Sequence, residues 1–335
     1  MLITRTPLRI SFAGGGTDFR GFYKDEDGVV ISAAIDKFIY IVLMERYDDD
    51  IYVNYSKKEI VKSPAQLNHE LVREALSMSK VEKGVEITCL ADIPSEQGSG
   101  LGSSSAFTVG LLNALFQFSG KQIPAEALAE KACIIEIERC GKHIGKQDQY
   151  AAACGGVNVI NFNKDESVAV ENVGLTERTL EDFDARLMLF YTNIPRKSGA
   201  ILKEQEDNIL SKNKTDILRK MKCQAQEIKQ ALISKRFDDA GRILNEGWEM
   251  KKQLAGPISN PEIEKMYALA LDAGALGGKI CGAGGGGFLM LYTPLDKRDS
   301  VRGALNNYRE MPFRFEKQGS AAIFNIKDHP WKWEK

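Results

Sequence analysis

The sequence predicts an α+β fold made of two domains. Runs typical of strands and runs typical of helices follow one another irregularly, without the strict β–α alternation of a parallel sheet. A length of 335 residues is sufficient for two domains of ordinary size. We expect an N-terminal domain over residues 1–182 and a C-terminal domain over residues 183–335.

The N-terminal domain is expected to begin with strands and to continue with helices. Alternating or apolar runs predict strands at residues 8–12, 29–34, 38–44 and 51–55, and later at 84–90 and 156–160. The runs at 38–44 and 51–55 are expected to form a ribbon that turns at Asp48–Asp50. Periodic or wholly apolar stretches predict helices at residues 66–80, 104–119 and 124–140.

The C-terminal domain is expected to open with a buried strand at residues 186–191. From Gly199 to about Leu254 the pattern is almost wholly helical, with Gly241 and Gly247 as expected interruptions. A further helix is predicted from Pro261 to Ala275. Two last strands are expected at residues 287–292 and 321–326.

The composition excludes several classes of function. The 45 basic and 46 acidic residues nearly balance, which argues against nucleic acid or an anionic membrane as a partner. The six cysteines show no Cys-x-x-Cys pair and are expected to be reduced, buried thiols. The N-terminus lacks the apolar core of a signal peptide, and the three histidines are too scattered for a zinc site. We therefore expect a cytoplasmic monomer or homodimer that acts on a small molecule.

The most informative segment is the glycine-rich stretch from Pro94 to Ala106. Glycines alternate at positions 98, 100 and 102, three serines follow, and an apolar run predicts a buried helix. A glycine loop at a helix N-terminus favours phosphate, because unpaired N–H groups and the helix dipole both attract anions. Taken alone, the segment also fits a glycine turn with a serine N-cap.

Two further glycine segments lie near the ends of the chain. At the N-terminus, a strand carrying Arg9 leads through Gly14–Gly16 to Thr17 and Asp18. Asp18 is a natural acceptor for sugar hydroxyls, although an Asx turn would use the same residues. Near the C-terminus, residues 279–288 contain four consecutive glycines, and the strand-like run that follows them excludes the dinucleotide-binding fingerprint.

A fourth segment carries the carboxylates. Glu136 and Glu138 lie on a predicted helix, and Asp148 follows Gly145 in a loop. A carboxylate in such a loop beside a cation can orient a hydroxyl group and accept its proton, but Asp148 could equally cap the next helix. The two glutamates are two residues apart and therefore point to different sides of the helix.

These segments together resemble the three motifs of the GHMP kinases, the superfamily of galactokinase, homoserine kinase, mevalonate kinase and phosphomevalonate kinase. The motifs occur in the family's order and span essentially the whole chain. The resemblance implies an N-terminal domain like ribosomal protein S5 domain 2, a ferredoxin-like C-terminal domain, and an active site in the cleft between them. It also implies ATP and Mg²⁺ as cofactors.

The resemblance assigns roles residue by residue. Asp148 matches the catalytic base, and Arg9 would act either on Asp148 or on the transferring phosphoryl group. Ser104 and Glu136 match the magnesium ligands, with Glu136 preferred over Glu138. The residues expected to bind nucleotide phosphates are Gly98, Ser99, Gly100, Leu101, Gly102, Ser103 and Ser104. The residues expected to bind the acceptor are Thr17, Asp18, Gly285, Gly286, Arg196 and Lys197, with Arg20 as a further candidate for an acceptor phosphate.

Within the superfamily, residues 13–18 and 145–150 look most like those of the bacterial D-glycero-D-manno-heptose 7-phosphate kinases. That resemblance implies transfer of the ATP γ-phosphate to the anomeric hydroxyl, giving the 1,7-bisphosphate on the route to GDP-heptose and surface glycans. The alternatives are a fucokinase- or galactokinase-like enzyme for an unphosphorylated sugar, and a non-catalytic sugar-sensing regulator on the same fold.

Overall fold

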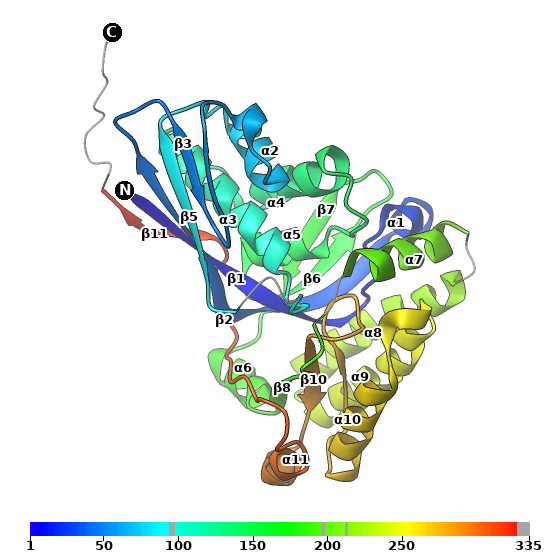
Figure 1. The fold of residues 1–335 in the computed structure, drawn as a ribbon. Helices are drawn as coiled ribbons and strands as arrows, with labels where there is room; N and C mark the ends of the chain where they lie inside the picture. Colours follow the sequence, from blue (N-terminus) through cyan, green and yellow to red (C-terminus); the bar gives the residue numbers. More distant parts are fainter. Residues whose placement is uncertain (94–97, 196–197, 212–213, 327–335) are drawn as a thin grey trace.

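The computed structural model describes residues 1–93, 98–195, 198–211 and 214–326. An eight-stranded sheet and a smaller three-stranded sheet organise these residues, with helices packed around both (Figure 1). This arrangement confirms the predicted α+β fold.

The large sheet is built around two long strands. Its members are β1 (Leu2–Ala13), β2 (Gly28–Glu45), β3 (Ile51–Asn54), β4 (Lys58–Val61), β5 (Val85–Ala91), β6 (Val157–Phe162), β7 (Val168–Asn172) and β11 (Ala321–Asn325). Their order is β11-β1-β2-β5-β3-β4, and β6 pairs with β2 and then with β7. The first half of β2 pairs with β6 and the second half with β5, so β2 joins both parts of the sheet.

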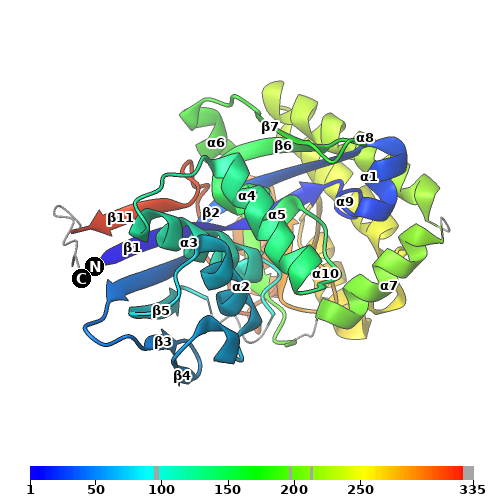
Figure 2. The same cartoon turned by 90° about the horizontal axis from the view of Figure 1, so that it is seen from above.

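Helices cover both faces of β1 and β2 (Figures 1 and 2). One face carries α2 (Glu70–Ser79), α3 (Ser103–Phe118), α4 (Ala125–Cys133) and α5 (Gln147–Cys154), and the other carries α8 (Thr215–Ile233) and α9 (Phe237–Lys252). This double cover explains the consecutive apolar residues at 29–31, because a strand buried on both faces needs no polar alternation. The central helix α3 is buried from Ser105 to Phe116, as its all-round apolar sequence predicts.

The second half of the chain surrounds the small sheet. Its strands β8 (Leu187–Tyr191), β9 (Gly277–Ile280) and β10 (Phe288–Tyr292) run antiparallel in the order β8-β10-β9. The remaining helices are α1 (Arg20–Glu26), α6 (Glu177–Asp184), α7 (Ser198–Leu210), α10 (Pro261–Asp272) and α11 (Arg298–Ala304). The last strand, β11, returns to the large sheet and pairs with β1 (Figure 1). The domain boundary after residue 182 stays a prediction.

Two predicted details of the elements are wrong. The ribbon between residues 38–44 and 51–55 does not form, because β5 lies between β2 and β3 and pairs with both. Gly241 and Gly247 do not interrupt a helix, since both lie inside α9. A Cβ on Gly241 would stand 2.4 Å from the Tyr292 ring, so the glycine permits close packing of α9 on β10.

The structure shows how exposed the cysteine thiols are and whether any helix could span a membrane. All six cysteines are free, but only Cys133 and Cys281 are buried, and Cys223 is exposed, so the expectation of uniformly buried thiols is wrong. Among the described residues, no helix combines the length and the apolar character needed to cross a membrane.

Candidate active site

A cavity of about 460 Å³ lies where the large sheet, the glycine loop and the second half of the chain meet. Residues from both halves line it, including Arg9, Ser11, Asp18, Gly98–Gly100, Gly102–Ser105, Glu136, Lys142, Asp148, Gly199, Leu202, Gln205, Lys251, Lys279, Gly282 and Ala283. The cavity therefore brings together residues from all four segments that the sequence singled out.

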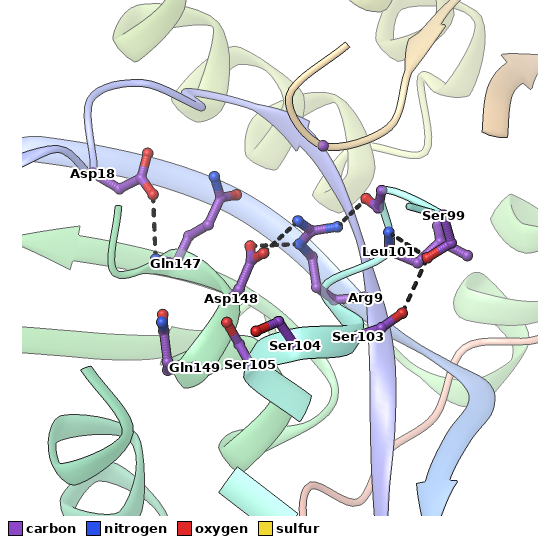
Figure 3. A network of polar contacts seen from close by, with 12 residues as sticks. Arg9, Asp18, Ser99, Leu101, Ser103, Ser104, Ser105, Gln147, Asp148 and Gln149 are labelled. Carbon is purple, nitrogen blue, oxygen red and sulfur yellow. Dashed lines mark hydrogen bonds and ion pairs between the residues drawn. The ribbon is translucent and has the colours of Figure 1, made fainter. Parts of the chain in front are cut away.

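Arg9 and Asp148, which both line the cavity, form a bidentate ion pair (Figure 3). The Arg9 Nε and Nη2 atoms each donate a hydrogen bond of 2.7 Å to one oxygen of the Asp148 carboxylate. The third guanidinium nitrogen donates to the carbonyl oxygen of Gly100 at 2.6 Å. Because the guanidinium group is planar, these bonds fix the carboxylate in one orientation beside the glycine loop.

The glycine loop has the conformation of an anion-binding site. Gly98, Gly100 and Gly102 have φ values of 66°, 80° and 79°, which residues with a side chain rarely adopt. The loop leads directly into the N-terminus of α3 at Ser103. Ser99 stabilises the loop through its hydroxyl group. This group lies 3.0 Å from the Ser103 hydroxyl group and accepts a hydrogen bond from the Leu101 N–H (Figure 3). Alternating left-handed residues before a helix N-terminus leave backbone N–H groups available for phosphate oxygens.

Glu136 is held in place by a dense set of hydrogen bonds. It lies in a π-helical turn (Ile134–Arg139) that continues α4, and its side chain is completely buried. Its two carboxylate oxygens accept from the Ser104 hydroxyl at 2.6 Å, from the Ser105 hydroxyl at 2.7 Å and from the Gln149 amide at 2.7 Å. Glu138, by contrast, is exposed.

Ser104 and Glu136 offer a suitable oxygen pair for a divalent cation. The Lys142 ammonium group lies 2.9 Å from Ser104 Oγ and 3.2 Å from Glu136 Oε1, so a positive charge already faces both oxygens. The described residues contain no group of three or more His, Cys, Asp or Glu side chains arranged for a metal. Magnesium commonly uses one or two protein ligands and completes its shell with phosphates and water, so this donor set fits the ion.

Asp18 lines the same cavity beside Asp148. Its carboxylate accepts from the backbone N–H groups of Gly16 at 2.9 Å and Gln147 at 3.3 Å. Burial raises the pKa of Asp18, the negative charge of Asp148 adds to that effect, and the two amide hydrogen bonds oppose it. Thr17 is not among the cavity-lining residues, because its hydroxyl group binds the backbone of Gly14 and Val29.

The third glycine segment approaches the first glycine loop closely. A Cβ on Gly287 would lie 2.6 Å from the Ser99 carbonyl oxygen, so only glycine allows the two loops to meet. Gly282 and Ala283 of this segment line the cavity. Gly285 instead packs against Ile201 and Pro257, and Gly286 packs against Ile194, so this segment reaches the cavity at earlier positions than the sequence suggested.

Of the basic residues proposed to receive an acceptor phosphate, the structure describes Arg20 alone. Arg20 is 71% exposed and forms an ion pair with Glu166 at 2.7 Å, away from the cavity lining. It is therefore not a suitable phosphate receptor. Arg196 and Lys197 lie outside the described residues.

Several cavity residues carry no sequence signal of their own. Lys142 contacts the proposed metal ligands, and Lys251 and Lys279 also line the cavity. Lys279 stands at the start of the third glycine segment, which was the only available indication.

The described geometry agrees with comparisons against known proteins. Residues 59–156 match the family described as GHMP kinases N terminal domain, and residues 228–310 match GHMP kinases C terminal. The D-glycero-alpha-D-manno-heptose 7-phosphate kinase of Campylobacter jejuni is 31% identical over 94% of this chain and 97% of its own length. The L-fucokinase/L-fucose-1-P guanylyltransferase of Bacteroides fragilis is 27% identical over 89% of this chain, but over only 35% of its own length. A crystal structure of a D-glycero-D-manno-heptose 1-phosphate kinase from Bacteroides thetaiotaomicron superposes with a TM-score of 0.81 and 26% identity, covering 97% of this chain and 99% of that one.

Proposed function

Because the chain belongs to the GHMP kinase family and is an ATP-dependent carbohydrate kinase, we propose that its acceptor is D-glycero-D-manno-heptose 7-phosphate. It transfers the γ-phosphate of ATP to the anomeric hydroxyl and makes the 1,7-bisphosphate, an intermediate on the way to GDP-heptose for surface glycans. The heptose kinase of Campylobacter jejuni, which is similar over nearly its full length, supports the sugar. The observation that carries the chemistry is the Arg9–Asp148 pair, which lies between the glycine loop and Asp18 in one cavity.

In this mechanism the protein mainly positions groups and neutralises charge. The backbone N–H groups of residues 98–104 and the N-terminus of α3 hold the phosphates of ATP. Asp18 binds acceptor hydroxyl groups and orients the sugar. Asp148 accepts the proton of the anomeric hydroxyl group. At the same time the oxygen of that hydroxyl group attacks the γ-phosphorus, and the bond between this phosphorus and ADP breaks. Arg9 keeps the Asp148 carboxylate in the orientation that accepts this proton.

Ser104 and Glu136 would hold Mg²⁺ at the nucleotide side of the cavity. When bound, the ion neutralises charge on the phosphate oxygens. Lys142 shares these two oxygens in the described structure, so it has to release them when the cation binds.

Replacing Ser104 with alanine should raise the magnesium concentration that gives the half-maximal rate by roughly 10-fold, the scale of a lost metal-supporting contact. Magnesium titrations at saturating ATP and acceptor measure this effect. Ser103→Ala is the matched control, because the Ser103 hydroxyl binds Ser99 rather than Glu136. An unchanged magnesium dependence in Ser104→Ala would limit that residue to a role at the start of α3.

An acceptor panel tests the proposed substrate. ADP formation is coupled to a colour change and measured with the heptose 7-phosphate, the unphosphorylated heptose, L-fucose and galactose. We expect kcat/KM to favour the heptose 7-phosphate over the heptose by about 10- to 100-fold, the range of a charge-assisted contact to an ion. If L-fucose or another neutral sugar is the best acceptor, the fucokinase-like alternative replaces this proposal.

A further inference from the structure

Lys279 is a buried cation that lines the cavity. It lies on β9, its side chain lines the cavity, and the residue is 5% exposed. Its ammonium group donates to the Phe12 carbonyl oxygen at 3.1 Å, which is the one hydrogen bond found for it within the described residues. An ammonium group has three donors, and burying such a charge without partners for them is costly. The arrangement is therefore suited to an anion that enters the cavity.

Ser11 adds a second donor at the same place. It lines the cavity at 5% exposure, and its Oγ atom has no hydrogen-bond partner among the described residues. Because side chains alternate along a strand, Ser11 shares one face of β1 with Arg9. The adjacent Phe12 supplies the carbonyl oxygen that Lys279 contacts. The unpaired Ser11 hydroxyl group and the carbonyl oxygen that holds the Lys279 ammonium group thus belong to adjacent residues of β1.

The position along β1 separates this place from the nucleotide. The backbone N–H of Arg9 donates to the Leu101 carbonyl oxygen at 2.9 Å, so β1 meets the glycine loop at Arg9. Ser11 and Phe12 lie further along the strand, in the direction of Asp18. Lys279 is consequently on the acceptor side of the Arg9–Asp148 pair.

We propose that Lys279, assisted by Ser11, binds the phosphate group of a phosphorylated acceptor. The proposal rests on the proposed function, since it assumes that the acceptor carries a phosphate. It replaces Arg20 as the phosphate receptor with two residues that line the cavity. It also makes Lys279 a determinant of specificity, because its contact distinguishes a sugar phosphate from the corresponding neutral sugar.

Among the described residues, no carboxylate forms a direct ion pair with the Lys279 ammonium group, although several charges lie around it. The pKa of Lys279 is lowered to about 8, chiefly by burial; the charge of Arg9 also acts to lower it, while Cys281 and Asp18 act to raise it. The Lys251 ammonium group on α9 adds another positive charge nearby, because it donates to the carbonyl oxygens of Ile280 and Gly282. A bound phosphate would favour the charged form of Lys279.

The decisive experiment compares Lys279→Met with Lys251→Met. Methionine keeps the length of the side chain, and replacing a buried charge with an apolar group is often tolerated by a fold. We expect Lys279→Met to reduce the preference for the heptose 7-phosphate over the heptose by about 10- to 100-fold in kcat/KM. The KM for ATP should stay unchanged. Lys251→Met is expected to keep the preference, since the Lys251 ammonium group already donates to two carbonyl oxygens.

The pH dependence gives a readout that a purely structural lysine would not change. Above pH 8 the unliganded protein loses the Lys279 proton, so affinity for a phosphate falls as the pH rises. The KM for the heptose 7-phosphate should rise above this pH with a slope approaching about tenfold per pH unit, the limit for one proton. The phosphate itself stays doubly charged there, because its second pKa is about 6. In Lys279→Met the rise should disappear.

The outcomes distinguish this inference from the proposed function. If the wild type prefers the heptose 7-phosphate and Lys279→Met keeps that preference, Lys279 is not the receptor although the function holds. If Lys279→Met weakens both acceptors equally, the residue binds a hydroxyl group or supports the fold. If the wild type shows no preference for the heptose 7-phosphate, the proposed function fails. The role of Lys279 is then tested by measuring how strongly inorganic phosphate inhibits the kinase reaction. Equal inhibition of the wild type and of Lys279→Met would overturn the inference. Ser11→Ala, which removes an unpaired hydroxyl group, should show a smaller loss of preference in the same direction.

Discussion

Replacing Asp148 with asparagine is expected to lower kcat by about 10²-fold or more, the scale of a positioned general base, while the affinity for ATP stays close to that of the wild type. Among the described residues, Asp148 is the one carboxylate that pairs with Arg9, and an amide of the same shape cannot take a proton there. Single-turnover rates and nucleotide binding, measured on the same samples, separate the chemical step from binding.

A control is needed because Arg9 is only 4% exposed and loses its carboxylate partner in this variant. Asp184→Asn makes the same chemical change in another aspartate–arginine pair, since Asp184 accepts a hydrogen bond from Arg314 at 2.6 Å. Asp184 lies outside the cavity lining, so its variant should keep its turnover even if its thermal stability falls. Near-normal turnover in Asp148→Asn would remove Asp148 from the proton transfer.

The long, strongly patterned elements could be predicted from the sequence. The apolar helix α3, the strands β5, β6, β8 and β10, and the helix α10 all lie within a few residues of their predicted positions. Elements that depend on tertiary packing were missed: α1 has only 7 residues and no side-chain cap, and β9 is a run of 4 residues that begins with two glycines. Local sequence patterns also do not reveal which strands pair. β5 lies between β2 and β3 in the sheet although 30 residues separate it from β3 in the sequence.

In the candidate site, too, residues within short motifs could be predicted from the sequence, whereas contacts between distant segments could not. The glycine loop, Asp18 and Asp148 are contained in short motifs, and the structure places them around one cavity. The supports of Glu136 come from separate segments, since Ser105 and Gln149 are 31 and 13 residues away from it in sequence. Lys279 contacts Phe12 across 267 residues. No local pattern shows that this lysine is buried, so only the fold could identify it.

Replacing Glu136 with glutamine is the second change expected to have a large effect. The carboxylate accepts from two serines and an amide, and Lys142 also contacts it, so its negative charge is surrounded by donors. A glutamine would turn an NH₂ group toward at least one of these donors and would remove the charge that attracts a cation. We expect kcat/KM to fall at least by the roughly 10- to 100-fold seen when a metal's supporting partner is lost. The magnesium concentration for the half-maximal rate should rise in the same variant.

Glu138→Gln is the matched control for Glu136→Gln, because it is the same chemical change two residues away on an exposed side of the helix. It should leave both the rate and the magnesium dependence unchanged. Loss of activity in Glu136→Gln without a change in magnesium dependence would mean that the glutamate only anchors Ser104 and Ser105. Equal losses in both variants would contradict the assignment of Glu136 altogether, because a solvated glutamate has no contact with the cavity through which to act on the metal.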